Sequence, residues 1–142
     1  MKTVAQLLKA KAGGIYSISP AASVLDCVRL LADKGIGAVL VMEGDKLAGI
    51  ISERDYARKV VLQGKSSKDT MVREIMTSDL VSVTLKQTSD ECMALMSTKR
   101  IRHLPVVEDS KVMGVLSIGD LVRNIIEEQQ IAINELERYI HG

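Results

Sequence analysis

The feature that most constrains the fold of this chain is an internal repeat at a constant offset. When the sequence is shifted by 65 positions, Ser17–Arg58 lies over Ser82–Arg123 without a gap, and twelve of the 42 pairs are identical. A repeat of this period indicates one supersecondary unit that buries its apolar face against a neighbouring copy. Thr3–Leu8 also resembles Met71–Met76, after a further shift of three residues.

Each copy has the same predicted order of elements. The expected elements of the first copy are an alternating strand at 16–19, a helix capped by Ser23 with Asp26, two strands at 38–42 and 47–51, and a helix after Ser52. The second copy repeats them with a strand at 80–84, a helix capped by Thr88 with Glu91, and a helix after Ser117. Pro105 implies an edge or end position in its strand, because proline cannot donate to a ladder.

The repeat predicts an α/β (α+β) fold of two βαββα units. A unit of this kind cannot bury the apolar face of its own sheet, so we expect the two copies to pack through their small sheets about a pseudo-two-fold axis. The expected boundaries are 1–68 for the first repeat with an N-terminal helix, 69–123 for the second repeat, and 124–142 for a C-terminal amphipathic helix.

The composition excludes several classes of protein. A formal net charge of +1 over 142 residues gives no footprint for nucleic acid or an anionic membrane. The apolar stretches are too short to span a bilayer, and no signal peptide is recognisable. Two cysteines, Cys27 and Cys92, lack CxxC spacing. We therefore expect a cytoplasmic protein in which both are buried as small hydrophobic residues, without a disulfide or zinc site.

A serine and an aspartate three residues apart stand where the last strand of each copy turns into a helix, in Gly49–Asp55 and Gly114–Asp120. One interpretation is structural, since the serine caps the helix and the aspartate suits its dipole. The other is a ligand site. The hydroxyl lies beside unpaired helix N–H groups that bind phosphate, and an ionised aspartate accepts hydrogen bonds from both hydroxyls of a ribose.

A basic cluster distinguishes the second copy from the first. Lys99–Pro105 reads KRIRHLP, whereas the equivalent Lys34–Leu40 reads KGIGAVL. The cluster is either a solvated basic face or a set of phosphate-directed donors on one side of a pocket. Arg54 could add a bidentate donor.

These residues together resemble a CBS-domain pair, also called a Bateman module, over residues 3–123. The specific marks are the two G-h-h-S-x-x-D endings and Arg102–Val106. The resemblance implies stand-alone tandem CBS domains that bind AMP, ATP, NAD(H) or S-adenosylmethionine between the repeats, with no catalytic cofactor.

The resemblance also implies roles for individual residues. Asp55 and Asp120 would hold ribose hydroxyls, and Ser52 and Ser117 would lie near ribose or phosphate. Arg100, Arg102 and His103 would face phosphate. The rest of the expected nucleotide-binding set is Ser19, Gly37, Ala38, Arg54, Thr84, Pro105, Ile118 and Gly119. Because the first copy lacks the basic residues and the proline, equal occupancy of the two clefts is not expected.

The C-terminal segment lies outside the repeat and carries an apolar seam. The seam residues recur at alternating spacings of four and three, in the order Val122, Ile126, Gln129, Ile133, Leu136 and Ile140. This pattern predicts a helix with barely three heptads, interrupted by Gln129. The helix either packs on its own domain or forms a contact in a homodimer.

The residues give little support to an enzyme. With only two histidines, His103 and His141, no Cys–His pair or zinc-binding spacing is present. We therefore expect a non-catalytic sensor of adenine nucleotides. It would pass a signal through a homodimer or to an effector protein that the sequence does not identify. The alternative is a structural or protein-interaction module with no tight ligand.

Overall fold

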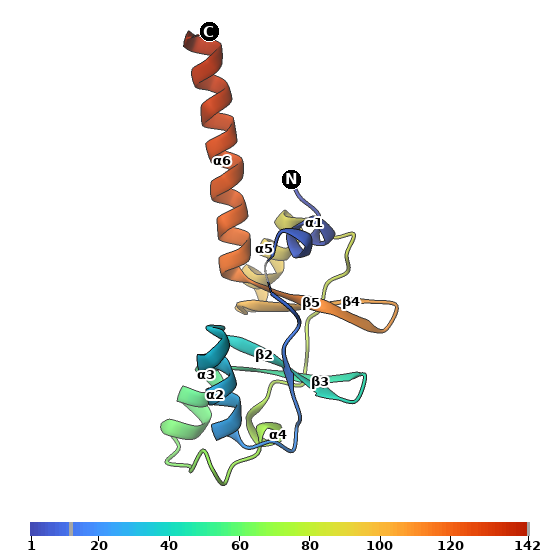
Figure 1. Cartoon of the computed structure of the whole chain (residues 1–142), viewed down its shortest axis with the longest axis vertical. Helices are drawn as coiled ribbons and strands as arrows, with labels where there is room; N and C mark the ends of the chain where they lie inside the picture. The colour runs from blue at the N-terminus through green and yellow to red at the C-terminus, as the bar shows by residue number, and fades with distance from the viewer. Residues whose placement is uncertain (12, 142) are drawn as a thin grey trace. The chain divides into compact units, whose positions relative to one another are not determined.

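The computed structural model describes residues 1–11 and 13–141 and divides into two compact units (Figure 1). The first-repeat unit is Gly14–Val81, and the second-repeat unit combines Met1–Gly13 with Ser82–Gly142. The structure confirms a mixed α/β fold with small sheets and a C-terminal helix.

The first-repeat unit has a three-stranded sheet. Its elements are β1 (Ser17–Ile18), α2 (Val24–Lys34), β2 (Ala38–Glu43), β3 (Lys46–Ser52), α3 (Glu53–Tyr56), the π-helix η1 (Ala57–Val61) and α4 (Val72–Ile75). The strand order is β1-β2-β3, with β1 parallel and β3 antiparallel to β2.

The second-repeat unit has a two-stranded antiparallel sheet of β4 and β5. Its elements are α1 (Val4–Ala10), α5 (Ser89–Lys99), β4 (His103–Glu108), β5 (Lys111–Ser117) and α6 (Ile118–His141). The pairs α2/α5, β2/β4 and β3/β5 begin and end at the predicted offset of 65 residues. The repeat in the sequence is therefore a repeat in structure, down to a register shift at the same place in each hairpin.

The N-terminal helix lies in a different unit from the one predicted. We expected residues 1–68 to form one unit, but α1 belongs to the second-repeat unit. The cause is backbone pairing: the Val4 and Ala5 N–H groups donate to the carbonyls of Gln87 and Leu85. In the other unit, the N–H of Val72 donates to the carbonyl of Ala22. Each repeat is thus completed by a short helix from outside it, which explains why Thr3–Leu8 resembles Met71–Met76.

Two further expectations differ from the structure. The predicted strand at 80–84 is reduced to one bridge between Val83 and Val106, because the Thr84 N–H turns away to the side chain of Gln87. The predicted boundary between residues 123 and 124 falls inside α6, which begins directly after Ser117 and continues to His141. How the two repeats pack together stays a prediction.

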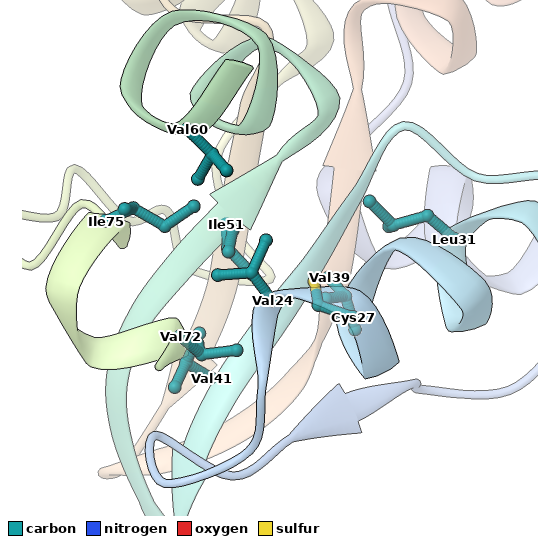
Figure 2. Close-up of a cluster of buried hydrophobic side chains, with 9 residues drawn as sticks. All are labelled: Val24, Cys27, Leu31, Val39, Val41, Ile51, Val60, Val72 and Ile75. Carbon is teal, nitrogen blue, oxygen red and sulfur yellow. The ribbon is translucent and has the colours of Figure 1, made fainter. Parts of the chain in front are cut away.

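The core of the first-repeat unit is aliphatic (Figure 2). The buried cluster is Val24, Cys27, Leu31, Val39, Val41, Ile51, Val60, Val72 and Ile75. Cys27 is 1% exposed, and its equivalent Cys92 is 0% exposed in the other unit. Both thiols are free, and burial raises the pKa of each to about 11. The expectation that the cysteines act as small buried hydrophobic residues is confirmed.

The ends of the repeated helices show why the sequence begins and ends them there. The hydroxyls of Ser23 and Thr88 accept hydrogen bonds from the third N–H of α2 and α5, as predicted. Glu91 returns a bond to the Thr88 N–H, whereas the Asp26 carboxylate lies near Arg29. Among the described residues, no helix is long and apolar enough to cross a membrane.

Candidate functional site

In the first-repeat unit, the Ser–Asp end forms a closed cap at the junction of β3 and α3. The Ser52 N–H donates to Asp55 Oδ2 at 2.9 Å, and the Asp55 N–H donates to Ser52 Oγ at 3.1 Å. The other carboxylate oxygen lies 3.2 Å from Lys59 Nζ, which also donates to the Ile75 carbonyl. Asp55 is therefore held by Ser52 and by Lys59 of η1, and it is partly buried, with 16% of its side chain exposed.

The beginning of β2 lies beside this cap. The Glu53 N–H donates to the Gly37 carbonyl at 3.0 Å, and Ala38 is opposite Ser52 in the sheet. The structure therefore brings Gly37, Ala38, Ser52 and Asp55 together, with Arg54 adjacent in sequence. Ser19 is not part of this group. It follows Ile18, which pairs with Val41, so Ser19 lies toward the opposite end of β2.

In the second-repeat unit, the Ser–Asp end has the same cap and a different set of cations. The Ser117 N–H donates to Asp120 Oδ2 at 2.8 Å, and the Asp120 N–H donates to Ser117 Oγ at 3.2 Å. Lys11 Nζ donates to the same Oδ2 at 2.9 Å and to the Val115 carbonyl at 2.8 Å. Arg123 pairs with Oδ1. Only 9% of the Asp120 side chain is exposed.

The surroundings of Asp120 favour its ionised form. Burial by itself would raise the pKa of Asp120, but hydrogen bonds from the Ser117 N–H and the Lys11 ammonium group more than offset burial. The pKa of Asp120 is therefore lowered from its ordinary value of 3.8. At neutral pH this residue is a carboxylate that only accepts hydrogen bonds, as a site for sugar hydroxyls requires.

The beginning of β4 brings part of the basic cluster to this cap. The Ile118 N–H donates to the Arg102 carbonyl at 2.8 Å, and His103 is opposite Ser117. Arg102, His103, Ser117, Ile118, Gly119 and Asp120 therefore gather at one end of the sheet. Arg100 ends α5 in the left-handed conformation, with φ 54° and ψ 45°. Gly35 has the same conformation in the first copy.

Two expected residues of the second repeat lie away from this end. Pro105 is buried opposite Val115, in the two-stranded sheet expected from its edge preference, and its carbonyl accepts from the Val83 N–H. Thr84 follows Val83 in a turn, where its carbonyl accepts from the Gln87 N–H. Like Ser19, Thr84 stands toward the far end of its sheet.

Sequence reasoning missed the cations that hold the two carboxylates. Lys59 and Arg123 are four and three residues from their aspartates, a helical spacing that favours ion pairs and could have identified them. No local signal identifies Lys11, because its partner is 109 residues away.

A pocket opens beside Asp120 between α1 and α6, with a volume of about 330 Å³. Its lining residues are Lys2, Leu7, Ala10, Lys11, Asp120, Arg123, Asn124 and Glu127. Asn124 is 3% exposed, and its Oδ1 has no hydrogen-bond partner among the described residues. Within residues 1–11 and 13–141, no three His, Cys, Asp or Glu side chains gather closely enough to hold a metal ion.

Comparison with known proteins agrees with this geometry. The mitochondrial CBS domain-containing protein CBSX3 of Arabidopsis thaliana is 42% identical over 125 residues, which cover 84% of this chain and 61% of that protein. A solved protein with CBS domains from Burkholderia ambifaria MC40-6 is 54% identical, with a TM-score of 0.87. The match covers 90% of this chain and 96% of that one.

A more distant structure is a CBS domain pair solved in complex with 5′-methylthioadenosine and S-adenosyl-L-methionine. It is 24% identical, with a TM-score of 0.80, and the match covers 89% of this chain and 98% of that one. The CBS domain family itself matches residues 13–62 and 72–127. These two segments contain both Ser–Asp ends. The chain therefore belongs to the CBS-domain family and carries two copies of the domain.

Proposed function

We propose that this chain is a non-catalytic regulatory module that binds an adenine nucleotide, AMP, ATP or NAD(H), at its Ser–Asp ends. The observation that carries the proposal is the duplicated cap, in which the same serine–aspartate bonds occur in both units. The same kind of reciprocal bonds also caps α1 and α5, so the distinguishing feature of the two Ser–Asp ends is that they recur where the last strand of each repeat turns into a helix. Both caps also lie beside the beginning of a neighbouring strand, where further ligand contacts are available.

The chemistry of the caps fits the ribose and phosphate of a nucleotide. Each aspartate presents two acceptor oxygens. One oxygen of Asp120 lies 2.9 Å from Lys11 Nζ, and one oxygen of Asp55 lies 3.2 Å from Lys59 Nζ. The two hydroxyls of a ribose would replace Lys11 at the Asp120 carboxylate or Lys59 at the Asp55 carboxylate. The released ammonium group could then pair with a phosphate of the nucleotide. The adenosine ligands named for the distant CBS pair above belong to the same chemical class.

A thermal-shift screen tests the proposal directly. Adenosine, AMP, ATP, NAD(H) and S-adenosylmethionine are added separately to the full chain. A ligand that binds only the folded state, at 100 times its Kd, adds about 2.7 kcal/mol to the free energy of unfolding. We expect at least one nucleotide to raise Tm, and Asp26→Ala, which removes an exposed carboxylate on α2, to leave this shift unchanged.

The competing function is an interaction module without a tight ligand. The observation in its favour is that both carboxylates already have cation partners, so the caps are stable without a nucleotide. An absence of any Tm shift with all five compounds at millimolar concentration would favour this function over nucleotide sensing.

We further propose that the chain acts as a homodimer through α6, in the cytoplasm, and signals through this dimer or to a separate effector protein. Residues 131–141 of α6 are all exposed in the single chain. The preceding turn of α6 contacts the rest of its unit, since Glu127 pairs with Lys2 and Glu128 pairs with the N-terminal amine. A chain truncated after Gln130 should therefore keep the second-repeat unit intact and lose dimer stability in sedimentation equilibrium.

A further inference from the structure

An apolar face runs along α6, and in its last turns no described part of its own unit covers this face. In Figure 1, these turns extend beyond α1 and α5, which belong to the same unit. Ile126 is 59% exposed, Leu136 62% and Ile140 72%. Val122 and Ile133 on the same face are also exposed. Soluble proteins rarely leave such a contiguous patch open to water.

The spacing of this face indicates that its partner is another helix. Alternating steps of four and three residues place the seam on one side of α6, as in helices that pair through a heptad repeat. A second copy of this chain supplies a seam of the same length and periodicity. Two such copies can pair parallel or antiparallel.

We infer that α6 pairs antiparallel with α6 of a second copy, in one register. This inference rests on the proposed homodimer and is independent of the proposed ligand. When Ile126 faces Leu136 of the partner subunit, two-fold symmetry places Gln129 opposite Ile133 of the partner subunit. The same symmetry places Val122 opposite Ile140 of the partner subunit. All six seam positions are then used, whereas a shift by one heptad leaves some of them unpaired.

Charge on the flank of the seam selects the antiparallel direction. Arg123 and Glu137 follow the first and fifth seam positions on the same flank. An antiparallel pair brings Arg123 beside Glu137 of the partner subunit, and symmetry forms this contact twice. In a parallel pair, Arg123 lies at the same height as Arg123 of the partner subunit, and Glu137 at the same height as Glu137 of the partner subunit, so the opposite charges do not meet. Arg123 already bonds Asp120, but its side chain is 69% exposed and its guanidinium has further donors.

The opposite flank agrees with close antiparallel packing. It is formed by Ile125, Ala132 and Tyr139, which lack charge. Ala132 lies near the centre of the proposed overlap, where a small side chain lets the helix backbones approach. The overlap from Val122 to Ile140 is about 28 Å long at 1.5 Å per residue.

Cysteine cross-linking distinguishes the two directions. The native thiols are 0–1% exposed, so they give little background. We prepare Ile126→Cys and Leu136→Cys as separate chains, and oxidise each alone and both mixed. The antiparallel register predicts a cross-linked dimer in the mixture and almost none from either chain alone. A parallel pair instead predicts cross-linking of Leu136→Cys with itself, and that result would overturn the inference while leaving the homodimer in place.

Sedimentation equilibrium on matched charge variants provides the second readout. Glu137→Arg should raise the dimer Kd by roughly three- to tenfold, because it replaces two exposed attractions with repulsions. Glu135→Arg makes the same charge change away from the seam and should leave the Kd unchanged. Equal effects of the two variants would contradict the register. A full-length chain that stays monomeric at every concentration would overturn both the homodimer and its orientation.

Discussion

At the end of β3, Asp55 pairs with Lys59 of η1, four residues along the chain, whereas at the end of β5, Asp120 pairs with Lys11, which is 109 residues away in the sequence. The two caps have the same backbone bonds and differ in their cations. Lys11 and the basic cluster at the beginning of β4 both belong to the second-repeat unit. The two copies thus share the scaffold of the site, while different residues at matched positions, such as Arg100 for Gly35, and Lys11 from outside the repeat make them electrostatically different.

The largest expected difference between the caps concerns phosphate. If the basic cluster contacts phosphate, Arg100→Gly together with Arg102→Ala should weaken AMP binding by roughly ten- to hundredfold, since a hydrogen bond to a charged group contributes about 1.5–3 kcal/mol. Adenosine affinity should change little, and the loss should shrink at high salt. Calorimetric titration with both ligands checks this, and equal weakening of the two would make the cluster a surface feature.

The residues that end the helices before β2 and β4, Gly35 and Arg100, can each be replaced by the other, and we expect the two substitutions to change the free energy of unfolding in opposite directions. Arg100 occupies a left-handed conformation that costs a non-glycine residue about 1 kcal/mol or more, and Gly35 occupies the same conformation without that cost. We expect Arg100→Gly to stabilise the chain by about 0.5–1 kcal/mol and Gly35→Arg to destabilise it by about 1 kcal/mol. Urea unfolding measures both changes, and a loss of stability in Arg100→Gly would show that the arginine side chain outweighs its backbone strain.

A smaller effect should come from removing Lys11. Because the pKa of Asp120 is lowered in the folded chain, its ionised form stabilises the fold above the ordinary value of 3.8. This contribution is lost as the pH falls through the lowered pKa. Lys11→Met removes one cause of the lowering, so the pKa of Asp120 should rise and acid unfolding should begin at a higher pH.

At neutral pH, Lys11→Met should cost less than about 1 kcal/mol, as partly exposed ion pairs usually do. Lys9→Met, in the last turn of α1, which ends just before Lys11, is the matched control. Lys59→Met should have an even smaller effect, because Lys59 and Asp55 are more exposed than Lys11 and Asp120. Identical acid unfolding of the Lys11 and Lys9 variants would show that Lys11 does not stabilise the ionised cap.

The predictable part of the fold is the part encoded by local pattern and repeat. Capping residues at Ser23 and Thr88, the two hairpins and the caps at Ser52 and Ser117 depend on neighbours in sequence and form as expected, except that the Asp26 carboxylate lies near Arg29 and does not complete the capping box at Ser23. The placement of α1 was predicted wrongly, because backbone bonds to Leu85 and Gln87 determine it. Those bonds join segments about 80 residues apart, which no local propensity reveals.

In the candidate site too, residues marked by a local sequence pattern were predicted, and a residue placed by a long-range contact was not. Residues near the ends of β3 and β5 were found from the repeated serine and aspartate, and the structure gathers them within each unit. Ser19 and Thr84 were included by family resemblance, yet both stand toward the other end of their sheets. Lys11 was missed because its role depends on a tertiary contact with Asp120.

The most direct test of the account is calorimetric titration of AMP into the full chain and into Asp55→Ala, Asp120→Ala and the control Asp26→Ala. If the carboxylates accept ribose hydroxyls, each cap variant should lose roughly ten- to hundredfold in affinity at its own site, because a charged acceptor contributes about 1.5–3 kcal/mol. The control should bind like the unmodified chain. Correctly folded Asp55→Ala and Asp120→Ala chains with unchanged affinity at every site would contradict the assignment of the Ser–Asp ends as nucleotide sites.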